Sequence, residues 1–335
     1  MLDFSKKEEV VNYKVSVIVP IYKVERYIAR CVTSLFEQTL DEVEFVFVND
    51  CTPDASMAIV SEILREYPNR QDAVQYVHQH VNTGLPAARN AGLAVAVGKY
   101  IFHCDSDDWV EPDMMECMYK CAELNGADIV YSDWYLSFMK KERLMREPVF
   151  FKASECLKAI LCGKMKYNVW NKLVKRKLYT DNGILFPDGL NMGEDMTMIK
   201  LFCHAGKVTH VDAAFYHYVQ VNANAYTKNI STSSLQQVYD NATIVINYIK
   251  RMYDDRFSSE LQSFKLSVKL PLLISAQREY YETWLTWFPE ANLYIGLSGS
   301  SRMRFIQHAA LTRKFWILRL HYYGIMKLMY GIIYR

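Results

Sequence analysis

The feature that most constrains this chain is a short apolar run that ends in three carboxylates. Residues 100–109 read Tyr-Ile-Phe-His-Cys-Asp-Ser-Asp-Asp-Trp. An apolar run of this length before an acidic cluster is typical of a buried strand that delivers its acids to the edge of a sheet. At about 5 Å and an effective dielectric near 20, each pair of carboxylates repels by roughly 3 kcal/mol. A divalent cation with oxygen ligands would offset that repulsion, so Asp105, Asp107 and Asp108 predict a metal site, with a solvated acidic turn as the alternative.

The first 130 residues alternate between strand patterns and helix patterns. Apolar and β-branched runs predict strands at residues 15–19, 43–48, 74–78, 100–103 and 129–131. Apolar side chains at helical spacing predict helices that begin near Glu25, after Thr52-Pro53-Asp54, at Pro86 and at Pro112. Strands that alternate with helices predict an α/β fold with a mostly parallel sheet covered on both faces.

Polar and aromatic side chains follow three of these predicted strands. Pro20 and Tyr22 end the first strand, Asp50 ends the second, and the Asp105 cluster ends the fourth. Because ligands of such sheets bind beyond the carboxyl ends of the strands, we expect these groups to line one site. The sequence has no GxGxxG after the first strand and no GxxxxGK[ST], which argues against a dinucleotide dehydrogenase and a P-loop enzyme.

Bulk properties set limits without naming a function. A chain of 335 residues, 51% of them hydrophobic, can form one large or two smaller domains. The net charge of +2 gives no general case for nucleic-acid binding. The eight cysteines show no CxxC spacing, and the first residues are too charged for a signal peptide. We therefore expect a reducing, cytoplasmic location.

The charges are distributed unevenly along the chain. After Glu290 there are seven basic residues and no acidic one, so the preceding part carries −5 from 32 basic and 37 acidic residues. The same tail is rich in aromatic residues, but Arg319, His321 and Lys327 interrupt it too often for a membrane span. Two interpretations stay open: a segment that binds the surface of an anionic membrane, or helices that pack on their own domain.

Taken together, the motifs resemble glycosyltransferase family 2. The resemblance rests on residues 15–22, 48–50, 82–92 and 105–109, and it extends through residues 193–195 and 216–218. It covers roughly residues 13–220 and implies the GT-A fold, a Rossmann-like and mostly parallel sheet flanked by helices. Beyond it we predict a C-terminal helical extension. The predicted parts are a leader at 1–12, a GT-A domain at 13–225 and a helical region at 226–335, whose basic, aromatic tail starts at about 300.

The resemblance also implies roles for the residues that would bind the nucleotide sugar. Pro20 and Tyr22 would line the base, and Asp50 would accept a hydrogen bond from a uracil ring. Arg89 would lie near the base and the diphosphate, where a guanidinium suits phosphate oxygens. The alternatives are that Asp50 closes the turn before Pro53 and that Arg89 is a surface side chain.

A metal site is implied by the same resemblance. Asp107 would bind the metal, and Asp105 would hold either ribose hydroxyls or a metal-bound water. Asp108 would support them, and His217 would be an additional metal or phosphate ligand unless it is a core histidine. Oxygen ligation suits Mn²⁺ or Mg²⁺.

The catalytic base implied by the resemblance is Asp195, which would take the proton of the acceptor hydroxyl. Glu194 would contact the acceptor or brace the loop, and Trp170 would form a wall of the acceptor site. The alternative for Asp195 is structural, because an acid at the start of a helix is stabilised by the helix dipole and the free N–H groups.

The function that follows is a metal-dependent, inverting glycosyltransferase of the hexosyltransferase type. It would move a monosaccharide from a nucleotide diphosphate sugar, UDP-linked by preference, to a hydroxyl of a glycan or lipid-linked oligosaccharide. We expect the enzyme in the cytoplasm; if the C-terminal tail binds membrane rather than its own domain, the enzyme would lie at the inner face of the membrane. The alternatives are a sugar nucleotidyltransferase and a non-catalytic protein that binds nucleotide sugars.

Overall fold

The chain forms two compact units. The computed structural model describes residues 12–222, 231–297 and 299–324, so most of the predicted leader and the last eleven residues of the tail lie outside the described residues. The first unit comprises Met1–Lys152, Asn168–Asn191 and His204–Lys228. The second comprises Ala153–Tyr167, Met192–Cys203 and Asn229–Arg335. Two short segments that precede residue 225 therefore belong to the second unit.

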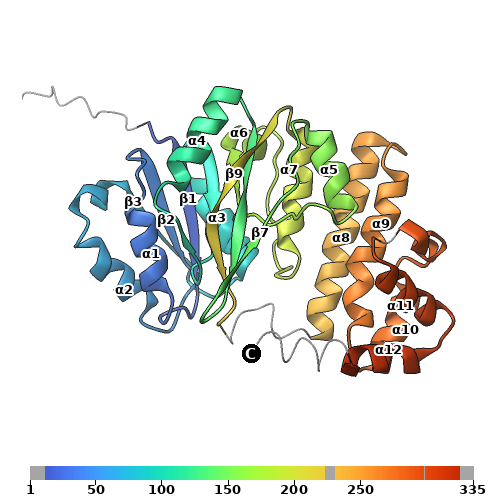
Figure 1. Cartoon of the computed structure of the whole chain (residues 1–335). Coiled ribbons are helices and arrows are strands. Elements are labelled where there is room, and N and C mark those ends of the chain that lie inside the picture. Colours follow the sequence, from blue (N-terminus) through green and yellow to red (C-terminus); the bar gives the residue numbers. More distant parts are fainter. Residues whose placement is uncertain (1–11, 223–230, 298, 325–335) are drawn as a thin grey trace, which may run out of the picture. The chain divides into compact units, whose positions relative to one another are not determined.

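The first unit is built on one sheet, which has nine strands among the described residues. The five strands expected from the sequence are present, and four more complete the sheet (Figure 1). The strands are β1 (Val15–Ile21), β2 (Val43–Asn49), β3 (Val74–His78), β4 (Tyr100–His103), β5 (Trp109–Val110), β6 (Ile129–Ser137), β7 (Glu142–Met145), β8 (Lys172–Lys175) and β9 (Val208–Val219).

The sheet is mostly parallel, as predicted. The strand order is β3-β2-β1-β4-β8-β6-β9-β5, and β7 pairs with β6. Strands β1 to β4 pair in parallel, and β6 pairs in parallel with β9. Three strands run antiparallel to their neighbours, namely β5, β7 and β8. The expected α/β class is confirmed.

Helices cover both faces of the sheet at strand β2. Phe36 of α1 (Ile28–Phe36) packs edge-on against Phe45 and Phe47. On α3 (Leu85–Val95), a Cβ added at Gly92 would lie 2.4 Å from Ile18 of β1 and 3.1 Å from Val48 of β2. Because side chains alternate across a strand, Phe45 and Phe47 lie on one face and Val48 on the other. The helices α1 and α3 therefore lie on opposite faces.

The other helices of the first unit are α2 (Ser56–Leu64), α4 (Met114–Asn125) and α6 (Arg176–Thr180), with the 3-10 helix η1 (Pro68–Ala73). The predicted helix starts are close to those observed. The first helix begins at Ile28 rather than Glu25, and Pro53 precedes the helix that begins at Ser56. The N-cap position is Ala55, and Asp54, one residue earlier, accepts hydrogen bonds at Oδ1 from the N–H and the hydroxyl of Ser56.

Pro20 lies in a central strand, where proline usually removes a ladder hydrogen bond. The carbonyl of Ile18 accepts the N–H of Cys104, so this residue faces β4 rather than β2. Pro20, two residues further on, also faces the β4 side. Ile18 already pairs with His103, the last residue of β4, so Pro20 lies beyond the end of that strand. The missing N–H of Pro20 therefore costs the sheet no hydrogen bond.

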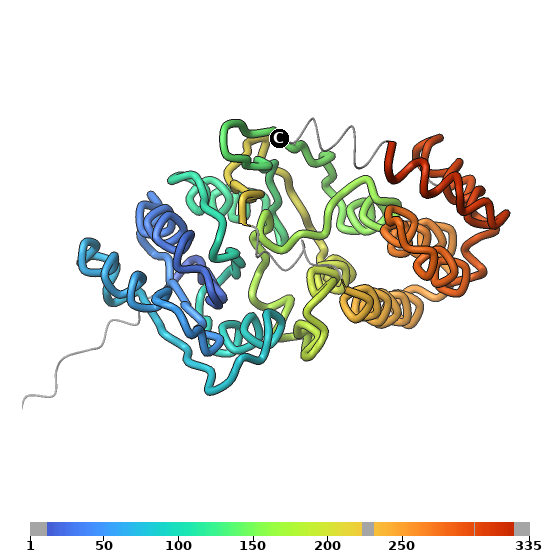
Figure 2. The backbone as a smooth tube through the Cα atoms, turned by 90° about the horizontal axis from the view of Figure 1, so that it is seen from below, coloured from blue at the N-terminus to red at the C-terminus, as the bar shows by residue number. Residues whose placement is uncertain are grey.

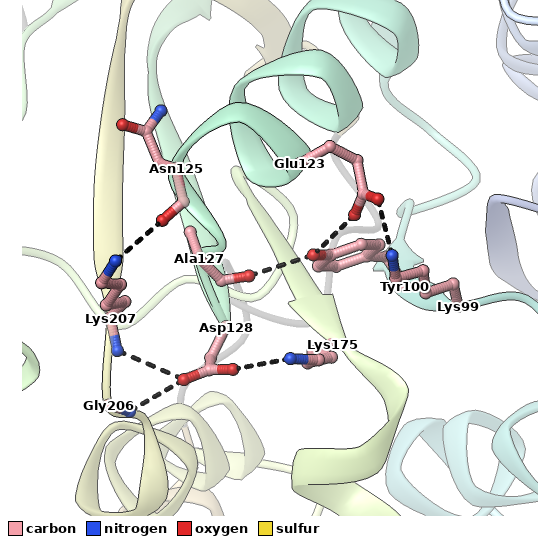
Figure 3. Close-up of polar contacts among 9 residues, drawn as sticks. All are labelled: Lys99, Tyr100, Glu123, Asn125, Ala127, Asp128, Lys175, Gly206 and Lys207. Atoms are coloured by element: carbon pink, nitrogen blue, oxygen red, sulfur yellow. Dashed lines mark hydrogen bonds and ion pairs between the residues drawn. The ribbon is translucent and has the colours of Figure 1, made fainter.

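Polar contacts tie the strands together at the amino end of β4 and β6 (Figure 3). Asp128 accepts the N–H groups of Gly206 and Lys207 at 2.9 and 3.2 Å, and pairs with Lys175 at 3.1 Å. The Tyr100 hydroxyl donates to the carbonyl of Ala127 at 3.0 Å. These contacts link β4, β6, β8 and β9 at the end that is opposite the predicted site.

The second unit is helical in the described residues. It contains α5 (Ala153–Leu161), η2 (Glu194–Met196), α7 (Thr197–His204), α8 (Thr232–Tyr253), α9 (Ser258–Lys269), η4 (Leu270–Leu273), α10 (Arg278–Thr286), η5 (Pro289–Leu297), α11 (Ser301–Leu311) and α12 (Phe315–His321). Helices α8 and α9 lie side by side (Figures 1 and 2). Within the described ranges, no helix is both long and apolar enough to cross a membrane.

A buried lysine organises this second unit. Lys269, at the end of α9, is fully buried, and its Nζ donates to the carbonyls of Trp284 and Trp287 at 3.3 and 2.8 Å. It also donates to the carbonyl of Phe288 and to Asn292 Oδ1. Burial lowers the pKa of Lys269 to about 8. The ammonium satisfies carbonyls at the end of α10 that the helix itself leaves without partners.

Replacing Lys269 by methionine should destabilise the second unit. The change leaves several buried carbonyls without donors, and we expect the free energy of unfolding to fall by about 3 kcal/mol. Urea unfolding followed by circular dichroism measures the change. The matched control is Lys158→Met, which removes an exposed lysine that pairs with Glu260 and should leave the unfolding midpoint nearly unchanged. Equal midpoints for the two variants would contradict this account of Lys269.

Candidate active site

The carboxyl ends of β2, β1 and β4 form one edge of the sheet. Strand β1 lies between the other two. After β1 the chain forms β2 and β3 on one side of it and then returns to form β4 on the other side. In parallel sheets, ligands bind outside the carboxyl ends of the strands at such a switch in strand order. The predicted residues Tyr22 and Asp50 directly follow β1 and β2, and Asp105 is the second residue after β4. The structure therefore places them at the same edge.

Asp50 is buried, and both its oxygens accept hydrogen bonds from the chain before α3. The N–H of Thr83 donates to Oδ1 at 2.7 Å, and the N–H of Gly84 donates to Oδ2 at 2.9 Å. The Thr83 hydroxyl adds a third contact. A carboxylate has about four acceptor positions, so one further donor can still be accommodated. The turn before Pro53 is instead closed by Asn49, whose Oδ1 accepts the N–H of Thr52.

Arg89 lies on α3 and pairs with Asp105. The guanidinium is 1% exposed, and its Nη2 lies 2.8 Å from Asp105 Oδ1. This burial excludes the alternative that Arg89 is a surface side chain. Gly84 precedes the first turn of α3, and Arg89 lies five residues further on, about 7.5 Å along the helix axis. The chain directly before α3 therefore contacts Asp50, and α3 itself contacts Asp105.

Asp107 and Asp108 have different environments. Asp107 is partly exposed, and its Oδ2 accepts the side-chain N–H of Asn222 at 2.8 Å. Asp108 is buried and accepts the Tyr216 hydroxyl and the Val219 N–H, each at 2.7 Å. Burial raises the pKa of Asp108 well above its usual range, and the nearby charges of Asp107 and Asp105 raise it further. Asp108 thus fastens the acidic loop to β9, while Asp107 keeps access to solvent.

Tyr216 holds the acidic loop at two points. Its hydroxyl donates to Asp108 and accepts the backbone N–H of Asp105 at 3.0 Å. Burial raises the pKa of Tyr216 well above its usual value, so the hydroxyl stays protonated and can donate. The resemblance covers Tyr216 without giving it a role, and Asn222 lies beyond its motifs. Their partners lie over a hundred positions away in the sequence, so no local sequence pattern predicts these contacts.

The two residues expected at the base differ in exposure. Pro20 is buried in β1, whereas the ring of Tyr22 is exposed and lies 5.0 Å from the Lys23 ammonium. Lys23 and Cys51, which follow β1 and β2, both have positive φ angles, 55° and 54°. The Lys23 N–H donates to the Thr52 hydroxyl at 2.8 Å and joins these two loops. Tyr22 therefore offers an accessible aromatic face on a fixed turn.

His217 is buried between two aromatic rings. It stacks on Trp109 with a centroid distance of 3.4 Å and on Tyr135 at 4.7 Å. Its Nε2 lies 2.9 Å from a Glu111 oxygen, and its Nδ1 lies 2.8 Å from a Glu142 oxygen. Both ring nitrogens have carboxylate partners here, so metal ligation by His217 would require one of them to give way.

Trp170, the residue expected at the acceptor, lies in an aromatic cluster. Its ring stacks on Tyr216 at 4.6 Å and on Tyr218 at 5.1 Å, and it meets Trp134 edge-on at 4.9 Å. The side chain is 4% exposed. It therefore supports Tyr216, which in turn holds Asp105 and Asp108.

Asp195 and Glu194 belong to the second unit. They lie in η2, directly before α7, so they occupy the helix start that the structural alternative requires. Glu194 is buried and Asp195 is partly exposed. Burial and the nearby charges of Asp195 and Glu194 raise the pKa of Tyr167 to about 12. The Tyr167 hydroxyl is therefore neutral at physiological pH, beside two carboxyl groups.

Oxygen donors that suit a hard divalent cation are concentrated in Asp105 and Asp107. In the part of the chain that the structure describes, no group of three or more His, Cys, Asp or Glu side chains is arranged to hold a metal ion. A magnesium-type site that is shared with a substrate phosphate typically uses only one or two protein carboxylates. The chemistry of the two carboxylates fits such a shared site.

Replacing Tyr216 by phenylalanine should loosen the acidic loop. The change removes one donor to the buried Asp108 and one acceptor for the Asp105 N–H, and we expect a loss of about 2 kcal/mol in the free energy of unfolding. Denaturant titration checks this value. The control is Tyr253→Phe in the second unit, which removes a hydroxyl that donates to the carbonyl of Cys203 and should cost less. A smaller effect for Tyr216 than for Tyr253 would contradict the assignment.

Comparison with known proteins identifies the family. Residues 16–189 match the family described as Glycosyl transferase family 2. The chain is 33% identical over 225 residues to the "Uncharacterized glycosyltransferase EpsJ" of Bacillus subtilis, an alignment that covers 64% of this chain and 63% of that protein. It is 31% identical over 261 residues to the "Putative glycosyltransferase EpsH" of the same species, covering 75% of this chain and 73% of that protein.

The fold is also similar to solved glycosyltransferase structures. The crystal structure of Staphylococcus aureus TarS residues 1–349 with UDP-GlcNAc superposes with a TM-score of 0.70 at 18% identity, covering 94% of this chain and 92% of that one. At that identity the likeness concerns the fold alone, which is of the GT-A type. This chain is therefore a glycosyltransferase of family 2, as the family match over residues 16–189 and the relatives that are 31% and 33% identical show.

Proposed function

We propose that this enzyme is a metal-dependent, inverting glycosyltransferase that uses a UDP-linked sugar. It transfers the monosaccharide to a hydroxyl of a glycan or of a lipid-linked oligosaccharide. The observation that carries the proposal is the gathering of Asp50, Arg89 and the acidic loop around one helix, α3, at the carboxyl edge of β2, β1 and β4. This edge is where such a sheet binds nucleotides.

The donor's base binds between Tyr22 and Asp50 in this proposal. Tyr22 has an exposed ring on which a base can stack, and Asp50 has acceptor capacity for the N–H of uracil. A base that presents only acceptors at that position would leave the carboxylate without a donor. The TarS structure cited above contains a UDP-sugar, which supports a UDP-linked donor.

The diphosphate lies near Arg89, Asp105 and Asp107. A guanidinium suits phosphate oxygens, and Arg89 is held in place by Asp105. Asp107 and Asp105 would hold Mn²⁺ or Mg²⁺, which when bound neutralises negative charge on the diphosphate leaving group. The Asn222 amide orients the carboxylate of Asp107, and Tyr216 fixes the loop that carries it.

Asp195 acts as the base that removes the proton from the acceptor hydroxyl. Its carboxylate is partly exposed, as a base that meets a second substrate must be. Glu194 and the neutral Tyr167 hydroxyl lie beside it and can orient it or the acceptor. One carboxylate base without a separate nucleophile fits a single displacement, which inverts the anomeric centre.

Asp107→Asn tests the metal-dependent step. The purified protein is incubated with UDP-sugars and Mn²⁺ without acceptor, and slow release of UDP is measured. We expect the variant to lose at least a hundredfold in UDP release, because the amide is a weaker ligand for a hard cation than a carboxylate. The matched control is Asp113→Asn, an exposed carboxylate before α4. Unchanged release by a folded Asp107→Asn variant would exclude the metal role.

Asp195→Asn tests the base. We expect thermal shifts with UDP-sugar and Mn²⁺ like those of the unchanged enzyme, and transfer reduced by on the order of a hundredfold or more. Asp240→Asn, which alters a carboxylate of α8 that pairs with Gln236, serves as the control in the same unit. Equal losses of donor binding and of transfer would instead indicate that Asp195 has a structural role at the helix start.

A further inference from the structure

Helix α12 is amphipathic in an unusual sense, because its outward face is apolar. Trp316 is 64% exposed, Leu320 63% and Tyr323 46%. The spacing i, i+4 puts Trp316 and Leu320 on one face of α12, and Tyr323 lies two residues after the end of the helix at His321. A helix on the surface of a soluble protein normally turns polar side chains outward. Two large apolar side chains on the exposed face of α12, with a third exposed just after the helix, therefore indicate an interaction surface.

The opposite face of α12 is already used for packing within the second unit. Leu318 is fully buried, and His321 is also buried. The ring of Phe315 lies 5.4 Å from that of Tyr281 on α10, and Arg278 lies over it at 5.7 Å. One side of the helix is therefore packed against the second unit. Trp316, Leu320 and Tyr323 are exposed although the helix itself is packed.

The charged side chains on α12 and directly before it are positive. Arg319 is exposed on the helix itself, and Arg313 and Lys314 are exposed directly before it. Arg313 pairs with Glu282 on α10 at 2.9 Å, an exposed ion pair of the weak kind, in which an anionic headgroup can replace the carboxylate. Residues 291–335 contain no aspartate or glutamate. A partner of this surface must therefore combine negative charge with an apolar region.

We propose that the outward face of α12 binds the surface of an anionic lipid membrane. Trp and Tyr rings prefer the boundary between lipid headgroups and acyl chains, and exposed Lys and Arg side chains bind anionic headgroups. Leu320 argues against a soluble polyanion as the ligand, because a leucine side chain gains nothing from a charged polymer. This arrangement predicts a weak, reversible and salt-sensitive contact with the membrane. The side chains that make it lie outside the candidate active site.

Sedimentation with lipid vesicles tests the proposal and does not depend on sugar transfer. The full chain should bind vesicles of phosphatidylcholine with 30% phosphatidylglycerol, and should bind pure phosphatidylcholine at least tenfold more weakly. Trp316→Ser combined with Leu320→Ser should lower binding to anionic vesicles by about tenfold. Arg313→Gln, Lys314→Gln and Arg319→Gln together should lower it by more, at roughly fivefold for each charge, and should remove most of its salt dependence.

Matched controls separate this surface from general effects of apolarity and charge. Leu124→Ser with Met139→Ser alters two other exposed apolar residues, and Arg65→Gln with Lys164→Gln and Lys177→Gln removes three other exposed charges. These variants should keep vesicle binding close to that of the unchanged chain. Release of UDP from a soluble donor should be the same in the α12 variants, which shows that they are folded.

Three results would overturn the proposal. The first is no binding of the full chain to anionic vesicles. The second is binding that survives Trp316→Ser with Leu320→Ser, which would assign the attraction to charge alone. The third is a dimer, detected by light scattering, that dissociates in the same double variant while vesicles are not bound, because the face would then join two copies of the chain.

Discussion

The crowding of carboxylates after β4 is the constraint on which the rest of the candidate site depends. Three acids in four residues repel one another, and the structure holds them by giving each a different partner. Arg89 pairs with Asp105, the Asn222 amide contacts Asp107, and the Tyr216 hydroxyl donates to Asp108. The most buried of the three has a strongly raised pKa. A cation near Asp107 would relieve the same repulsion, so the loop is suited to binding one.

Helix α3 connects the two halves of the nucleotide site. The chain before it donates two N–H groups to Asp50, and a residue in its second turn pairs with Asp105. Its start requires Gly84, which has a φ of +90° and approaches Asn191 so closely that a Cβ would lie 2.1 Å from Oδ1. Gly92 then lets the helix approach β1 and β2. Small residues in this helix therefore set where the charged residues of the site lie.

Much of this could be predicted from the sequence. The strand and helix patterns gave the α/β class and the mostly parallel sheet, because period-2 and period-3.6 apolarity reflect which side chains are buried. The strand ends predicted one edge for Tyr22, Asp50 and Asp105, and these residues do follow adjacent strands. The family could be recognised from the order of its motifs along the chain. Each motif is a short local segment, so recognising it needs no knowledge of distant contacts.

The sequence by itself determined five of the strands, the helices between them and which acids end a strand, because those properties depend on neighbours a few positions away. Only the tertiary structure decided the partners of those acids. Tyr216 and Asn222 reach the acidic loop from β9 and from the residues after it, and Glu111 and Glu142 occupy the two nitrogens of His217. The apolar outer face of α12 is likewise a tertiary property. The sequence shows Trp316 and Leu320 as apolar, but only the packing of Phe315 and Leu318 turns the other face outward.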